Sequence, residues 1–136
     1  MSAKVDQFCD KLRDQLDGVE DRLQTVKTNI QELPEQAEKS LRDKLAEAQS
    51  KLQAQKDRIE QTRTNLKARA QQKIDETKEA VSEWKAKREI RKLNARADRA
   101  ESYAADAIDY ALASIDEAEA AILEAVVARI DADAAQ

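Results

Sequence analysis

Histidine is absent from this 136-residue sequence, and glycine, proline, cysteine and tryptophan each occur once. Without histidine there is no imidazole base, no HExxH zinc motif and no Glu-x-x-His pattern of the di-iron helical bundles. A single cysteine excludes an intramolecular disulfide and any multi-cysteine zinc site. A single glycine excludes the glycine-rich loops that bind phosphate groups. We therefore expect no catalytic residues, no cofactor and no metal site, and we do not expect an enzyme.

The shortage of glycine and proline also limits the fold. A β-sandwich or an α/β domain needs many turn residues, whereas here 38% of residues are charged and only 3% are aromatic. The sequence thus predicts an all-α fold. We expect an elongated antiparallel coiled coil, a helical hairpin or a small bundle of about three helices, with residues 1–136 forming a single helical rod.

Long apolar runs are lacking as well. No segment approaches the roughly 20 apolar residues that cross a bilayer, and no charged stretch followed by an apolar run opens the chain as in a secretory signal. We expect no transmembrane segment and a cytoplasmic location.

The clearest pattern that is present is a heptad repeat in the first quarter of the chain. Apolar residues follow one another at alternating steps of four and three, which is typical of a coiled-coil face. Leucine on one position of the repeat and β-branched residues on the other favour antiparallel or higher-order packing over a parallel dimer. We predict that this face is an interaction seam, with Cys9 as a small buried residue, made of Val5, Cys9, Leu12, Leu16, Val19, Leu23, Val26, Ile30 and Leu33.

Two breaks are expected in the helical chain. Pro34 lacks an amide donor and suits the first turn of a new helix, so we favour a break there over a kink. The apolar phase slips between Trp84 and Ile90, and Asn94 is an acceptable N-cap for a helix that follows. The expected helices are therefore 4–33, a long central helix over 35–93, and an acidic, alanine-rich helix over 95–132.

Charge is distributed unevenly along the chain. Residues 55–96 carry a net charge of +6 and residues 97–136 a net charge of −8, although the whole chain is only at −4. We expect the acidic last helix to lie antiparallel along the basic stretch before it. Nucleic-acid binding is not expected, because the pI is about 5.1 and the acidic helix is adjacent. The basic patch consists of Lys85, Lys87, Arg88, Arg91, Lys92 and Arg96.

The expected last helix combines many carboxylates with an apolar face. Its carboxylates, for instance Asp116, Glu117 and Glu119, are expected to be solvated and not to form an active site. Its apolar face widens toward the end of the chain. This widening indicates a second candidate interaction face made of Ile115, Ile122, Leu123, Val126, Val127 and Ile130.

Two functional hypotheses follow. The first is a structural or interaction protein, a scaffold, spacer or adaptor that works through self-association or a partner helix. The second is an amphipathic protein that binds peripherally to a membrane or granule surface. The stretch LKARAQQKIDETKEAVSEWKAK resembles the eleven-residue repeats of late embryogenesis abundant proteins, and the overall composition resembles that of phasins; both would imply such a surface-binding, stress-protective role. The seam over Val5 to Leu33 departs from the first family and no motif of the second is present, so the chain is assigned to neither.

Overall fold

The computed structural model describes residues 2–136 and, except at 72–75, their side chains. All regular structure in this part of the chain is helical, which confirms the all-α prediction. There are four α-helices and not about three: α1 (Ala3–Glu32), α2 (Glu38–Asp75), α3 (Lys78–Ala86) and α4 (Ile90–Ala134), with a 3-10 turn, η1 (Leu33–Glu35), between the first two.

The first break lies where proline predicts it. Pro34 sits in the 3-10 turn, and Gln36 is extended with φ −93° and ψ 149°, so α1 and α2 are separate helices. At its other end α1 begins at Ser2, whose hydroxyl accepts a hydrogen bond from the amide of Val5 at 3.3 Å. Such a cap satisfies one of the free amides of the first turn.

The predicted central helix over 35–93 is wrong, because it is interrupted twice. Thr77 caps α3, accepting a hydrogen bond from the amide of Ala80 at 3.1 Å, and thereby separates α3 from α2. The chain then turns at Arg88, which has φ 51°, in the left-handed region that residues other than glycine rarely adopt. Asn94 is not the corner but lies inside α4.

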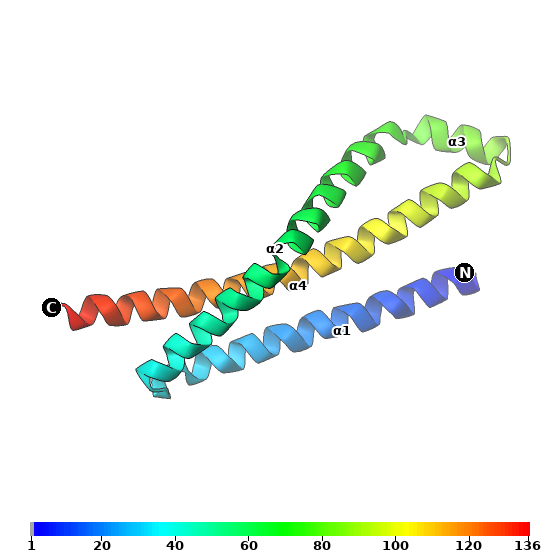
Figure 1. Cartoon of the computed structure of the whole chain (residues 1–136). Coiled ribbons are helices and arrows are strands. Elements are labelled where there is room, and N and C mark those ends of the chain that lie inside the picture. Colours follow the sequence, from blue (N-terminus) through cyan, green and yellow to red (C-terminus); the bar gives the residue numbers. More distant parts are fainter. Residues whose placement is uncertain (1) are drawn as a thin grey trace.

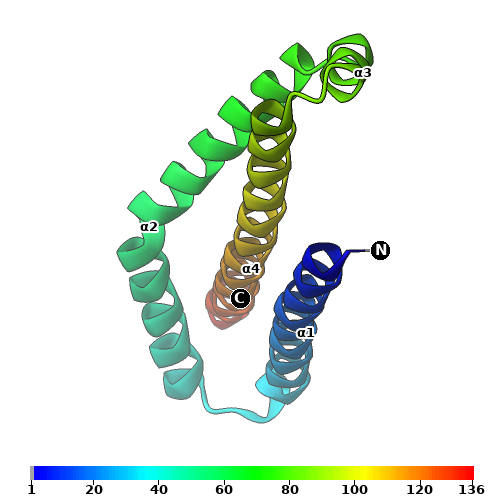
Figure 2. The same ribbon diagram turned by 90° about the vertical axis from the view of Figure 1, so that its right-hand side faces the viewer.

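The longest helix, α4, is the centre of the structure. Its 45 residues extend for about 68 Å at 1.5 Å per residue. Figure 1 shows α1 running in the same direction as α4, α2 running in the opposite direction, and α3 joining α2 to α4 at the far corner. Figure 2 shows that α1 and α2 lie on different sides of α4. The packing of the first three helices therefore depends mainly on the fourth.

The hydrophobic core lies at the end of the molecule where the turn between α1 and α2 meets the second half of α4. Leu33, Leu41, Leu123 and Val127 are buried there and contact one another. Around them pack half-buried apolar residues from three helices, namely Ile30, Leu45, Ala48, Ile122, Val126 and Ile130.

Candidate interaction surfaces

The interaction seam on α1 is divided by the packing into two rows of residues spaced seven apart. The Val19 row, made of Val5, Leu12, Val19, Val26 and Leu33, faces α4 along most of its length, and its last two members are buried. The Leu16 row, made of Cys9, Leu16, Leu23 and Ile30, is turned away, and only Ile30 in it is partly covered.

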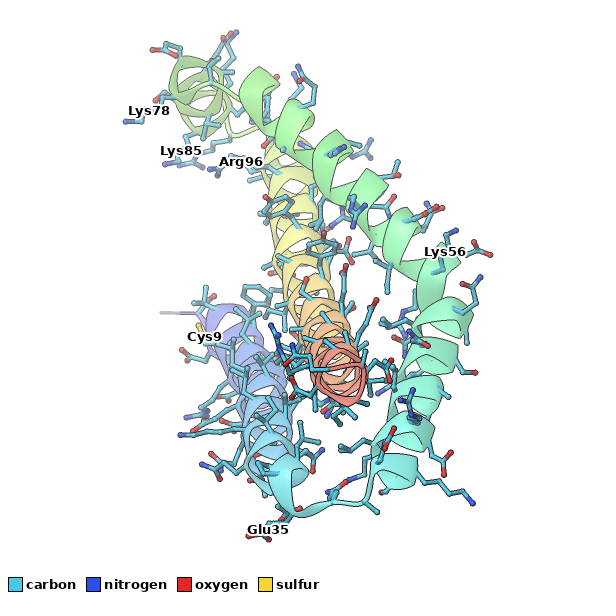
Figure 3. The ribbon with its side chains drawn as sticks, turned by 90° about the vertical axis from the view of Figure 1, so that its left-hand side faces the viewer. Cys9, Glu35, Lys56, Lys78, Lys85 and Arg96 are labelled. Atoms are coloured by element: carbon cyan, nitrogen blue, oxygen red, sulfur yellow. The ribbon has the colours of Figure 1, made fainter. Side chains whose placement is uncertain are left out.

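Exposure in the Leu16 row is large for apolar side chains. Leu16 is 53% exposed and Leu23 is 52% exposed, and Val5 at the start of the helix is 40% exposed. Cys9 is exposed too, so its predicted burial is wrong, and Figure 3 shows it on the side of α1 away from α4. In the described chain, three of the four exposed large apolar residues are thus on one helix.

A polar row takes the place that the Leu16 row would have had against α4. This polar row consists of Gln15, Arg22 and Asn29, which are half-buried and continue the seven-residue spacing that begins at the half-buried Phe8. Arg22 makes the decisive contacts: its Nη2 lies 2.7 Å from Asp116 Oδ1 and 3.3 Å from Glu119 Oε1. Its Nε also donates to Asp116 Oδ1 at 2.8 Å. These bonds fix the rotation of α1 about its own axis.

The same acidic residues of α4 also contact α2, since Lys51 Nζ lies 3.5 Å from Asp116 Oδ2. Burial lowers the pKa of Arg22, but the hydrogen bond to Asp116 and the charges of Glu119 and Asp116 outweigh that effect and raise the pKa above its ordinary value. Arg22 therefore stays charged. Asp116 and Glu119 were expected to be solvated, yet only Glu117 is exposed. The available signal was the spacing of Gln15, Arg22 and Asn29 along the edge of the seam.

The polar row is not fully satisfied. The Oε1 atom of Gln15 is buried without a hydrogen-bond partner, and so is Glu119 Oε2. A buried polar atom without a partner costs about 1–3 kcal/mol. The α1–α4 interface therefore buries polar atoms at a cost while apolar residues of α1 remain in solvent.

The second candidate interaction face lies within the chain's own packing. Leu123 and Val127 are buried in the core, and the other residues of this face are half-buried. All of them except Ile115 belong to, or pack against, the buried cluster that also contains Leu33 of the turn and Leu41 of α2. In the single chain this face is already covered.

The basic patch lies at the corner between α3 and α4, where Figure 3 labels Lys85 and Arg96. All six of its side chains are exposed. Lys87 pairs with Glu83 at 2.6 Å, and Lys92 pairs with Glu89 at 3.0 Å. The Lys92 ammonium also lies 5.9 Å from the centroid of the half-buried Trp84 ring.

The acidic last helix pairs instead with basic residues outside the patch. Across the antiparallel α2–α4 interface, Arg69 lies 3.3 Å from Asp106, and Arg42 pairs with Asp131. Arg63 donates to the Tyr110 hydroxyl at 3.3 Å. Of the patch, Arg96 lies 3.9 Å from Glu76 between α2 and α3, and Lys92 contacts the Trp84 ring of α3. The six basic side chains are therefore mainly presented to solvent.

Two further structural findings bear on the site. No helix among the described residues is long and apolar enough to cross a membrane. Nor do the described cysteine and carboxylate residues form any group of three that could hold a metal ion. No protein-family model matches the chain, and neither a curated protein nor a solved structure shows significant similarity to it.

Proposed function

We propose that this chain is a non-enzymatic interaction protein, a helical scaffold, spacer or adaptor that associates through the exposed side of α1. The observation that supports it is the Leu16 row: Leu16 and Leu23 remain about half exposed although the chain is folded around α4. Covering half of a leucine side chain contributes roughly 1 kcal/mol. A second helix laid along this row would complete the heptad seam that the sequence contains.

Sedimentation equilibrium of the reduced protein tests this proposal. The wild-type chain is expected to self-associate, and the double variant Leu16→Asp/Leu23→Asp is expected to be monomeric, because carboxylates cannot be buried in an apolar contact. Gln7→Asp/Thr28→Asp is the matched control, since it adds the same two charges on the opposite side of α1 and should associate like the wild type.

Circular dichroism separates loss of association from loss of folding. All three proteins should have the same helix content in dilute solution, because the four substituted residues are exposed. If Leu16→Asp/Leu23→Asp associates as strongly as the wild type, the Leu16 row is not the contact surface. A wild-type chain that is monomeric at every concentration would contradict self-association, and the partner would then have to be another helical protein.

One observation favours a second function, binding to an anionic membrane or granule surface. Ile90 is 59% exposed, the most of any large apolar residue described, and it lies among the basic side chains of the corner. An apolar residue surrounded by lysine and arginine suits the boundary between lipid headgroups and acyl chains. The vesicle test is co-sedimentation with phosphatidylserine vesicles, using phosphatidylcholine vesicles as the control.

Ile90→Asp and Arg91→Glu should each abolish such binding, and added salt should weaken it. Circular dichroism of the chain with and without the anionic vesicles shows whether binding changes its helix content. Equal sedimentation with both vesicle types would contradict this second function.

A further inference from the structure

A row of alternating charges runs beside the Leu16 row on α1. Asp6, Arg13, Glu20 and Lys27 are spaced seven apart, and all four are exposed. On a heptad helix they lie next to the Leu16 row, on the side away from the Val19 row that packs on α4. Arg13 pairs with Asp10 at 2.7 Å, but both side chains are about 70% exposed, so this bond contributes little.

Alternation of sign at this spacing matches one arrangement of two identical helices. When two such helices pair in opposite directions, the same flanking row of each helix faces its counterpart. If Leu16 contacts Leu16 of the second copy, then Leu23 lies against Cys9 of the second copy. In this register Arg13 is opposite Glu20 of the second copy, and Asp6 is opposite Lys27 of the second copy. Every charge in the row thereby meets its opposite.

Antiparallel registers shifted by one heptad, and a parallel pair, do not have this property. Shifting one helix by a heptad in one direction places Arg13 against Arg13 and Asp6 against Glu20. Shifting it in the other direction places Glu20 against Glu20 and Arg13 against Lys27. In a parallel pair, the charged row faces the polar row, where Lys27 would meet Arg22 and Glu20 would meet the uncharged Gln15. Like charges in contact destabilise a helix pair, and a shift by two heptads brings together only Asp6 with Arg13, or only Glu20 with Lys27. The first register alone pairs all four charges of the row with opposite charges.

We infer that the partner of α1 is α1 of a second copy of this chain, antiparallel, with Leu16 at the two-fold axis. This inference rests on the proposed function, because it names the occupant of the Leu16 row. It also places α4 of each copy on the outside of the α1 pair, since α4 covers the adjacent Val19 row of its own chain. The assembly is closed, and the expected species is a dimer.

Charge exchange between two variants tests the register directly. Arg13→Glu places glutamate opposite glutamate twice in each dimer, and Glu20→Arg places arginine opposite arginine twice. Each variant alone should associate about tenfold or more weakly than the wild type, measured at low ionic strength because salt screens such contacts. An equimolar mixture should regain wild-type affinity, because the glutamates of one chain then face the arginines of the other.

The double variant Arg13→Glu/Glu20→Arg should also associate like the wild type, since it reverses both pairs between residues 13 and 20 and leaves the pairs of Asp6 with Lys27 unchanged. Asp21→Arg is the matched control for Glu20→Arg: it makes the same change of charge one residue along, on the side of α1 away from the Leu16 row, and should leave affinity unchanged. All these side chains are exposed, and equal circular dichroism spectra will show that each variant is folded.

Disulfide formation gives an independent measure of direction. In the antiparallel register the two Cys9 residues are separated by 14 residues of helix, about 21 Å, which is far beyond the roughly 4–7 Å between the Cα atoms of a disulfide. Wild-type protein should therefore give no cross-linked dimer on mild oxidation. Leu16→Cys in a Cys9→Ser background should cross-link readily, because residue 16 lies at the two-fold axis.

The outcomes separate the two proposals. Failure of the mixture to regain affinity, or ready cross-linking through Cys9, would overturn the antiparallel register. If Leu16→Asp/Leu23→Asp is nevertheless monomeric, the interaction function of the Leu16 row stands without it. Loss of association in both single charge variants, together with recovery in their mixture, establishes the register.

Discussion

Arg22 on α1 and Asp116 on α4 are 94 residues apart in the sequence, yet Nη2 of the first lies 2.7 Å from Oδ1 of the second. The side chains are only 24% and 14% exposed. This partly buried pair, extended by Glu119 and Lys51, links α1, α4 and α2. It decides which side of α1 packs inward and which apolar row is left in solvent.

Replacing Arg22 tests the strength of that link. Arg22→Met leaves Asp116 and Glu119 partly buried with their main partner removed, so we expect the free energy of unfolding to fall by about 1–3 kcal/mol. Arg13→Met is the matched control, because the exposed Arg13–Asp10 pair contributes about 0–1 kcal/mol. Urea unfolding of dilute protein measures both. Equal losses would show that the Arg22 contacts do not hold α1 in place.

Removing the buried polar atom of Gln15 should stabilise the chain. Gln15→Leu keeps nearly the same volume against α4 and eliminates an oxygen that lacks a hydrogen-bond partner. The expected gain is about 1 kcal/mol, seen as a higher midpoint of thermal unfolding. Gln24→Leu, at an exposed position of the same helix, should give no such gain. A lower midpoint for Gln15→Leu would mean that the glutamine is satisfied in solution.

Replacing Gly18 should also stabilise the chain, but through helix propensity and not through a buried polar atom. It lies inside α1, and a Cβ atom added there would meet no atom within 4 Å. Because glycine is about 1 kcal/mol less favourable than alanine inside a helix, Gly18→Ala should raise the free energy of unfolding by about that amount. Differential scanning calorimetry measures it. Since Gly18 is not in the Leu16 row, an accompanying change in association would argue against the proposed surface.

Truncating a leucine should destabilise the fold far more in the core than in the Leu16 row. Leu123 is 6% exposed and packs against the other buried core residues. Leu123→Ala should therefore lower the free energy of unfolding by about 2–5 kcal/mol. Leu16→Ala makes the same change at a position that is 53% exposed, and in dilute solution it should cost less than about 1 kcal/mol. Chemical unfolding with urea compares them. Similar costs would mean that Leu16 is covered even at low concentration.

Composition was enough to predict the helical class, and Pro34 was enough to place the first break. The second corner shows the limit of local rules. The slip in apolar phase between Trp84 and Ile90 brackets the observed turn, but the preference of helices for an asparagine cap moved the predicted corner to Asn94. The chain turns instead at Arg88 with a positive φ, a conformation that no local preference of arginine indicates.

The interaction seam on α1 shows a second limit of prediction from sequence. Its apolar residues were identified from spacing alone, but spacing cannot tell which of them face a partner within the same chain. On α1 that choice follows from Arg22, whose acidic partners lie nearly a hundred residues away. Contacts between side chains so distant in sequence depend on how the helices pack, so they could not be read from a local pattern.

The central position of α4 has a consequence for how the chain is made. A ribosome synthesises α1, α2 and α3 first, and these helices have their main contacts with a helix that is the last to emerge. Leu33 and Leu41 must therefore wait for Leu123 before their apolar surface is covered. Contacts between such distant residues slow folding, and uncovered apolar surface on unfinished chains promotes aggregation. The nascent chain is thus most exposed to chaperones and proteases just before the 45 residues of α4 are complete.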